Sequence, residues 1–210
     1  MEKNSDYILE ACFKYQKNLM QKQFITSEQL LLDSYRLSMK IFESGFRPDY
    51  IVGLWRGGSP VGIAVQDCLD YLGIKTDHIS IRTSYRGLES YHQMIENSDS
   101  IRVHGTQYLI ENMNADDSLL IIDDVYSSGL SVQAVIQRLE KKCRQNMPSD
   151  VRIAVPWGKP AKNKTNRIPD FYLYETEEWL VLPYELNGLT EQEIAENKPV
   201  VKALADGLTL

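Results

Sequence analysis

The fold of this 210-residue chain is decided by the segment Leu119-Leu120-Ile121-Ile122-Asp123-Asp124-Val125-Tyr126-Ser127-Ser128-Gly129-Leu130-Ser131. Its four apolar residues in a row predict a strand that is buried on both faces, as strands of a parallel sheet are. Two adjacent carboxylates and a short loop rich in hydroxyls follow, and a helix is predicted over 131–143. A strand that passes through a short loop into an amphipathic helix is one unit of an α/β protein.

Strand and helix patterns alternate on both sides of this segment. Strands are predicted over 50–54, 77–82, 119–122, 151–155, 171–174 and 179–182. Helices are predicted over 6–22, 26–45, 59–73 and 131–143. These repeated units predict a parallel α/β sheet flanked by helices, with the chemistry at the carboxyl ends of the strands.

Two segments between the second and third of these strands are less regular. Residues 83–100 are polar and rich in serine, and they predict a mobile loop. Residues 101–104 and 107–110 are expected to form a hairpin that turns at Gly105.

Composition and charge exclude several classes of protein. The chain carries 23 Lys and Arg against 29 Asp and Glu, a net charge of -6, which disfavours a nucleic-acid partner. It has no apolar run of membrane-spanning length, and its polar N-terminus lacks the apolar core of a signal peptide. The three cysteines, at positions 12, 68 and 143, are far apart in the sequence, which indicates reduced thiols and not a disulfide framework. We therefore expect a cytoplasmic protein without a membrane or nucleic-acid partner.

The loop that follows the acidic pair suits a sugar phosphate. Backbone amides and hydroxyls at a helix N-terminus can hold a phosphate dianion, and Gly129 lets the backbone approach it closely. Asp123 and Asp124 can accept hydrogen bonds from two neighbouring ribose hydroxyls. Two other interpretations are a surface loop with an acidic helix cap and a metal site. Adjacent strand residues point to opposite sides, however, and make a poor direct chelate.

The same thirteen residues resemble the phosphoribosyl pyrophosphate (PRPP) signature of the type I phosphoribosyltransferases. In that family four apolar residues precede two acidic ones, and a Ser/Thr-rich loop containing glycine follows. The resemblance implies that Asp123 and Asp124 are the catalytic pair that holds the ribose hydroxyls. It also implies that the 5′-phosphate is bound by Ser127, Ser128, Gly129, Leu130 and Ser131.

A second segment, Val52-Gly53-Leu54-Trp55-Arg56-Gly57-Gly58-Ser59-Pro60, is a strand, a turn and a helix start. The exposed amides of Gly57 and Gly58, with the charge of Arg56, form an anion nest. The segment looks like the pyrophosphate loop of the same family, which implies that Arg56, Gly57 and Gly58 bind pyrophosphate. In that family the residue at this arginine often follows a cis peptide, so the Trp55–Arg56 bond is a candidate. Alone, such a turn also fits a plain strand-turn-helix.

A third pair of segments concerns the base. Trp157-Gly158-Lys159-Pro160-Ala161 and Glu178-Trp179-Leu180-Val181-Leu182-Pro183-Tyr184-Glu185 resemble the hood of purine phosphoribosyltransferases, closest to the bacterial xanthine–guanine enzymes. By that resemblance, Lys159 donates to the 6-oxygen of a purine, Trp179 stacks on the ring and the backbone at Leu180 reads its edge. Glu185 helps to hold Mg²⁺ on the pyrophosphate. The other interpretation is a surface lysine and a core tryptophan.

The sequence departs from the family pattern in the phosphate loop. Ser127 stands where the oxopurine enzymes usually have an aspartate that exchanges a proton with the purine. A serine is no general base at neutral pH without a partner. Three explanations of the missing proton acceptor stay open. The base arrives already deprotonated, a water or another carboxylate takes the proton, or the substrate is not a common 6-oxopurine. Leu130 also replaces a residue that is usually small or basic, although its amide remains available.

The resemblance divides the chain into an N-terminal helical extension at 1–26, a phosphoribosyltransferase domain at 27–190 and a tail at 191–210. The hood takes up roughly residues 156–190 of that domain. The implied activity is the Mg²⁺-dependent transfer of the phosphoribosyl group from PRPP to an oxopurine, with a homodimer or homotetramer as the expected assembly. The alternatives are a PRPP- or nucleotide-binding regulator of the same fold and a phosphoribosyltransferase for another nitrogen heterocycle.

Overall fold

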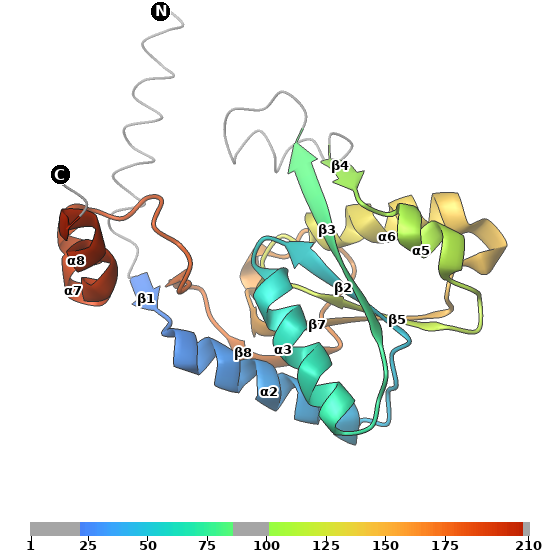
Figure 1. The fold of residues 1–210 in the computed structure, drawn as a ribbon. Helices are drawn as coiled ribbons and strands as arrows, with labels where there is room; N and C mark the ends of the chain where they lie inside the picture. The colour runs from blue at the N-terminus through green and yellow to red at the C-terminus, as the bar shows by residue number, and fades with distance from the viewer. Residues whose placement is uncertain (1–21, 86–100, 208–210) are drawn as a thin grey trace, which may run out of the picture. The chain divides into compact units, whose positions relative to one another are not determined.

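The computed structural model describes residues 22–85 and 101–207, which form two compact units (Figure 1). The larger unit is Leu31–Glu177, and the smaller unit combines the chain up to Leu30 with the chain from Glu178 onward. The helix predicted over 6–22 lies almost entirely outside the described residues. In the part of the chain that is described, no helix is both long and apolar enough to cross a membrane. The predicted domain boundaries at 26/27 and 190/191 stay predictions.

The larger unit is built on a seven-stranded sheet of order β4-β3-β2-β5-β7-β6, with β8 paired to β7. Its strands are β2 (Tyr50–Trp55), β3 (Asp77–Tyr85), β4 (Ile101–His104), β5 (Ser118–Ile122), β6 (Val125–Tyr126), β7 (Asp150–Gly158) and β8 (Phe171–Glu175). The pairing of β3 with β4 is antiparallel and the other pairings are parallel. The predicted parallel α/β class is confirmed.

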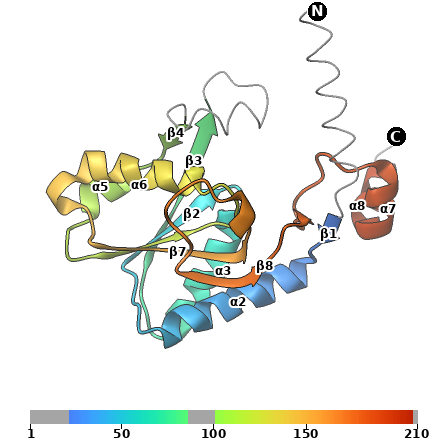
Figure 2. The same cartoon turned by 180° about the vertical axis from the view of Figure 1, so that it is seen from behind.

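Helices cover both faces of this sheet (Figure 1 and Figure 2). They are α2 (Ser27–Glu43), α3 (Gly58–Tyr71), α5 (Gln107–Asn112) and α6 (Leu130–Cys143), with short 3₁₀ turns at Arg144–Asn146 and Pro160–Lys162. The side chain of Thr26 caps α2, because its hydroxyl accepts a hydrogen bond from the Gln29 amide at 3.1 Å. In the two views α3 lies on one face of the sheet, whereas α5 and α6 lie on the other.

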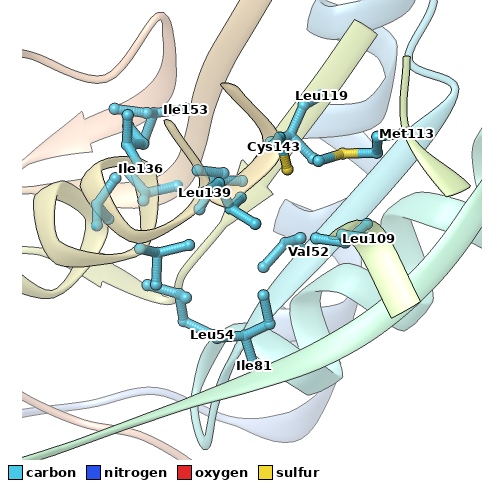
Figure 3. Close-up of a cluster of buried hydrophobic side chains, with 14 of the residues drawn as sticks. Val52, Leu54, Ile81, Leu109, Met113, Leu119, Ile136, Leu139, Cys143 and Ile153 are labelled. Atoms are coloured by element: carbon cyan, nitrogen blue, oxygen red, sulfur yellow. The ribbon is translucent and has the colours of Figure 1, made fainter. Parts of the chain in front are cut away.

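A hydrophobic core lies between the sheet and the helices α5 and α6, which cover one of its faces (Figure 3). Leu119 on β5 and Leu139 on α6 are completely buried there. On β5, Leu120 and Ile122 are equally buried but point to the opposite face of the sheet from Leu119. Burying an aliphatic side chain of this size contributes about 1.5–3 kcal/mol, so β5 is anchored on both faces. The acidic pair therefore follows a strand that is packed on both of its faces.

In the smaller unit, β1 (Lys22–Phe24) pairs in parallel with β9 (Trp179–Val181). Two helices follow, α7 (Glu191–Asn197) and α8 (Pro199–Gly207). Thr190 and Glu193 form a capping box at the start of α7, which explains why the tail is helical there. The ammonium of Lys198 donates to the carbonyls of Leu182 (3.0 Å) and Pro183 (2.9 Å) and ties the two helices to the chain after β9.

Two predictions were wrong. Residues 107–112 form the helix α5 and not the second strand of a hairpin, because Leu109 and Met113, four residues apart, are both buried against the core. The partner of β4 is instead β3, which continues to Tyr85 and pairs Thr83 with Val103. The predicted loop is thus a strand over 83–85, and its remainder, 86–100, lies outside the described residues.

Candidate active site

The turn after β2 and the acidic pair after β5 lie against each other at the carboxyl edge of the sheet. They meet because β2 and β5 are neighbours in register, with Gly53 opposite Ile122. A Cβ atom on Gly57 would lie 1.6 Å from Oδ2 of Asp124, and one on Gly58 would lie 2.2 Å from the carbonyl oxygen of Ile122. Only glycine allows this approach at either position. The peptide bond between Trp55 and Arg56, just before these glycines, is cis, as predicted.

The two carboxylates are half-buried and held by the local backbone. Asp123 Oδ1 accepts a hydrogen bond from the Asp124 amide (3.0 Å), and Asp124 Oδ1 accepts one from the Val125 amide (2.7 Å). Burial, with the nearby charge of Asp124, raises the pKa of Asp123 well above its usual value. Hydrogen bonds from the backbone of Asp124 and Gly58 oppose that rise. A ligand that donates hydroxyls to this pair would relieve the repulsion between the two charges.

A cavity of about 150 Å³ opens beside the acidic pair, at the start of α6. It is lined by Asp123, Val125, Tyr126, Ser127, Ser128, Gly129, Ser131 and Val132. Gly129 precedes the helix in the left-handed conformation (φ 73°), which favours glycine. The cavity thus joins serine hydroxyls to the N-terminus of a 14-residue helix, an arrangement that suits a phosphate. The side chain of Leu130 is buried in the core, so only its backbone is available to a ligand.

Lys159 follows β7 and is only 8% exposed, which excludes a surface lysine. Its backbone amide donates to the carbonyl of Tyr126 at 2.8 Å. Lys159 lines a second cavity of about 110 Å³, formed with Gly158, Pro160 and residues of the chain up to β8. Tyr126 lines both cavities, so it lies between the predicted phosphate site and the lysine predicted to bind the base.

The other residues predicted to bind the base or the metal belong to the smaller unit. Trp179 and Leu180 lie on β9, where Leu180 is buried and the Lys22 ammonium lies 5.0 Å from the Trp179 ring centroid. Glu185 follows β9, and its Oε2 accepts a hydrogen bond from the Leu182 amide at 3.2 Å. Among the described residues, no group of three or more His, Cys, Asp or Glu side chains could hold a metal ion.

Two contacts at the site were not predicted from the sequence. One is the contact of Asp124 with Gly57, which depends on the order of the strands. The other is made by Tyr126, a buried aromatic residue within a loop of hydroxyls, whose side chain bonds to the segment after β7. The aromatic residue itself was the available signal, since the three residues that follow it, Ser127, Ser128 and Gly129, are small.

The comparisons with known proteins agree with this geometry. A family model for the phosphoribosyl transferase domain matches residues 20–187. The chain belongs to the phosphoribosyltransferase family. The resemblance to the family is confirmed, and with it a glycosyltransferase type of enzyme. Comparison with curated proteins gives no match.

Solved structures give the same fold. A purine phosphoribosyltransferase from Pyrococcus horikoshii is 23% identical with a TM-score of 0.59, over 81% of this chain and 98% of that one. A xanthine-guanine-hypoxanthine phosphoribosyltransferase from Helicobacter pylori is 17% identical with a TM-score of 0.58, over 80% and 95%. A hypothetical protein from Neisseria gonorrhoeae with bound ppGpp is 18% identical with a TM-score of 0.64, over 88% and 97%. The phosphoribosyltransferase is thus similar in fold to purine enzymes.

Proposed function

We propose that this phosphoribosyltransferase transfers the phosphoribosyl group of PRPP to an oxopurine base in a Mg²⁺-dependent reaction. A ring nitrogen of the base forms the new bond to the anomeric carbon, and pyrophosphate leaves with the electrons of the old bond. The base loses one proton, and a nucleoside 5′-monophosphate results. The observation that carries the proposal is the meeting of the Arg56-Gly57-Gly58 turn with the acidic pair, beside a hydroxyl-lined cavity at a helix N-terminus.

Each part of PRPP has a group in the larger unit that matches its chemistry. The 5′-phosphate accepts hydrogen bonds from the amides and hydroxyls of the loop 127–131. The ribose hydroxyls donate to Asp123 and Asp124, and the pyrophosphate lies against Arg56 and the two glycine amides. The rate then comes from positioning the reactants and from stabilising the charge that develops on the leaving group.

The residues present fit a magnesium ion that is held mainly by the substrate. Mg²⁺ prefers oxygen ligands and commonly uses one or two carboxylates, substrate phosphates and waters. Glu185 would supply a carboxylate oxygen, and the ion would neutralise charge on the departing pyrophosphate.

The base is assigned to Lys159, Trp179 and Leu180. A buried ammonium suits an oxo group on a planar heterocycle, and the indole of Trp179 can stack on any such ring. The Lys22 ammonium lies 5.0 Å from the centroid of that indole, which is the cation–π geometry of an electron-rich aromatic face. The name of the Helicobacter pylori enzyme with the same fold, a xanthine-guanine-hypoxanthine phosphoribosyltransferase, supports an oxopurine as the acceptor.

A second function is favoured by one observation, the serine at position 127 where a proton acceptor is expected. The phosphate cavity offers hydroxyls and Asp123, but no second carboxylate lines it. A protein of this fold that binds PRPP or a nucleotide without turnover needs no proton acceptor there. The Neisseria protein, which holds ppGpp, is a nucleotide-bound example of the fold.

A turnover assay separates the two functions. The protein is mixed with PRPP and Mg²⁺, and hypoxanthine, guanine, xanthine and adenine are offered separately, with pyrophosphate release as the readout. We expect release with at least one oxopurine, and its loss when EDTA removes the metal. PRPP binding without release for any base would instead support the regulator. The Ser127→Asp variant, assayed beside the parent, tests whether proton transfer limits the reaction. If it does, the carboxylate introduced at position 127 should accelerate the reaction of the least acidic oxopurine most.

A further inference from the structure

We propose that Tyr126 is a positioning residue that holds the 5′-phosphate loop in its binding shape by bonding to the segment 163–167. The inference rests on the proposed function, since it concerns how that loop binds PRPP. The Tyr126 side chain is 3% exposed. Its hydroxyl donates to the carbonyl of Arg167 at 3.0 Å and lies 3.0 Å from Oγ1 of Thr165.

The segment that receives this hydroxyl is itself ordered by Asn163. Oδ1 of Asn163 accepts a hydrogen bond from the Thr165 amide at 2.9 Å, and its Nδ2 donates to the Arg167 carbonyl at 2.7 Å. The Asn163 side chain thus binds both the amide of Thr165 and the carbonyl of Arg167 and holds a tight turn, as asparagine often does. The carbonyl that Tyr126 uses is therefore held in place before the loop is bound to it.

Two backbone hydrogen bonds also join the chain after β7 to the loop. The Lys164 amide donates to the carbonyl of Ser128 at 3.0 Å, and the Lys159 amide donates to the carbonyl of Tyr126 at 2.8 Å. A Cβ atom on Gly129 would lie 2.4 Å from the Tyr126 hydroxyl and 2.8 Å from Oγ1 of Thr165. Hydrogen bonds from the chain after β7 thus hold residues 126 and 128, and Gly129 leaves room for the contact between Tyr126 and Thr165.

These contacts between the loop and the chain after β7 have a direct consequence for anion binding. A loop that binds phosphate through its amides must keep those amides aimed at one point, and ordering it only upon binding would weaken affinity. The Tyr126 hydroxyl points into the segment 163–167, so its contribution to binding passes through the loop backbone. A tyrosine hydroxyl is a neutral donor at physiological pH, and burial raises the pKa of Tyr126 further above that range.

The test compares Tyr126→Phe with the parent and with a matched control, Tyr50→Phe. The control removes a hydroxyl that likewise donates to a backbone carbonyl, that of Asn112 at 3.2 Å, but at the amino end of β2. Binding of ribose 5-phosphate is measured by calorimetry, and KM for PRPP and kcat are measured by pyrophosphate release. We expect Tyr126→Phe to weaken ribose 5-phosphate and raise KM by about 2- to 10-fold, with a smaller effect on kcat, and Tyr50→Phe to match the parent.

Variants of Thr165 separate positioning from general stability. Thr165→Ser keeps the hydroxyl and should bind ribose 5-phosphate as the parent does, whereas Thr165→Val should be weakened like Tyr126→Phe. Both changes remove the contact between the Tyr126 hydroxyl and Oγ1 of Thr165, and Tyr126→Phe also removes the hydrogen bond to the Arg167 carbonyl. Since one contact is shared, the double variant should lose less affinity than the sum of the two single losses. Parental binding by Tyr126→Phe overturns this inference while the proposed function stands. A parent that binds neither ribose 5-phosphate nor PRPP overturns both.

Discussion

Adding a methyl group to Gly57 or Gly58 should affect function and stability differently, although the two residues are adjacent. At Gly57 the methyl would meet the carboxylate of Asp124, at 1.6 Å from Oδ2 and 2.7 Å from Oδ1. At Gly58 it would meet backbone, at 2.2 Å from the Ile122 carbonyl oxygen and 2.9 Å from the Asp123 Cα. A side-chain terminus can turn away from an intruding methyl, whereas the end of a central strand cannot.

The expected magnitudes follow from what has to move. In Gly57→Ala the carboxylate of Asp124 must turn away from the place where it is proposed to accept a hydrogen bond from a ribose hydroxyl. Hydrogen bonds to a charged group contribute about 1.5–3 kcal/mol, so PRPP affinity should fall by about 10- to 150-fold. In Gly58→Ala the methyl overpacks the backbone at a cost of about 1–3 kcal/mol. For a chain of this size that lowers Tm by about 2–12 °C.

Two measurements on each variant check the reasoning, thermal unfolding by circular dichroism and PRPP affinity by calorimetry. Gly207→Ala is the control, because a Cβ atom there meets nothing within 4 Å. We expect Gly57→Ala to keep nearly the parental Tm but to lose affinity, and Gly58→Ala to lose both. Parental affinity in Gly57→Ala would refute the assignment of Asp124 to the ribose. A parental Tm in Gly58→Ala would refute the tight contact between the two strand ends.

Three further predictions concern the ionisable groups. Asp124→Asn should impair PRPP use in the turnover assay while leaving Tm close to that of the parent; full activity would contradict the ribose assignment. Lys159→Ala should raise KM for a 6-oxopurine much more than KM for PRPP, and equal rises would contradict its role at the base. Because the pKa of Asp123 is raised by folding, the native state gains stability relative to the unfolded chain as the pH falls. Asp123→Asn should therefore be more stable than the parent near pH 8, with the difference in Tm shrinking towards about pH 4; a constant difference would contradict the raised pKa.

The sequence predicted those parts of the fold whose signal is local. The run Leu119–Ile122 is buried as a parallel strand should be, and α6 follows it at the expected place. The family was identified from the same segment and from the turn at Arg56. In each case a few consecutive residues contain the strand, the turn and the helix start, so no knowledge of distant partners is needed.

The elements that were missed depend on partners far away in the chain. β1 has three residues and no periodicity of its own, and it exists as a strand because it pairs with β9, more than 150 residues later. The extension of β3 over 83–85 likewise depends on β4. α5 has only six residues, and the spacing between its buried Leu109 and Met113 at its C-cap becomes informative only when the core that both face is known.

The site combines both kinds of information, which explains why its residues could be predicted but its construction could not. The glycines at 57, 58 and 129 were predicted as places where the backbone approaches an anion. The structure adds that each also makes room for a part of the protein, respectively the Asp124 carboxylate, the Ile122 carbonyl and the Tyr126 hydroxyl. A substitution at one of these glycines would have to keep both the approach to the anion and the room for the neighbouring group. For that reason the loops should tolerate change at their serines, where a hydroxyl can be replaced by water, better than at their glycines.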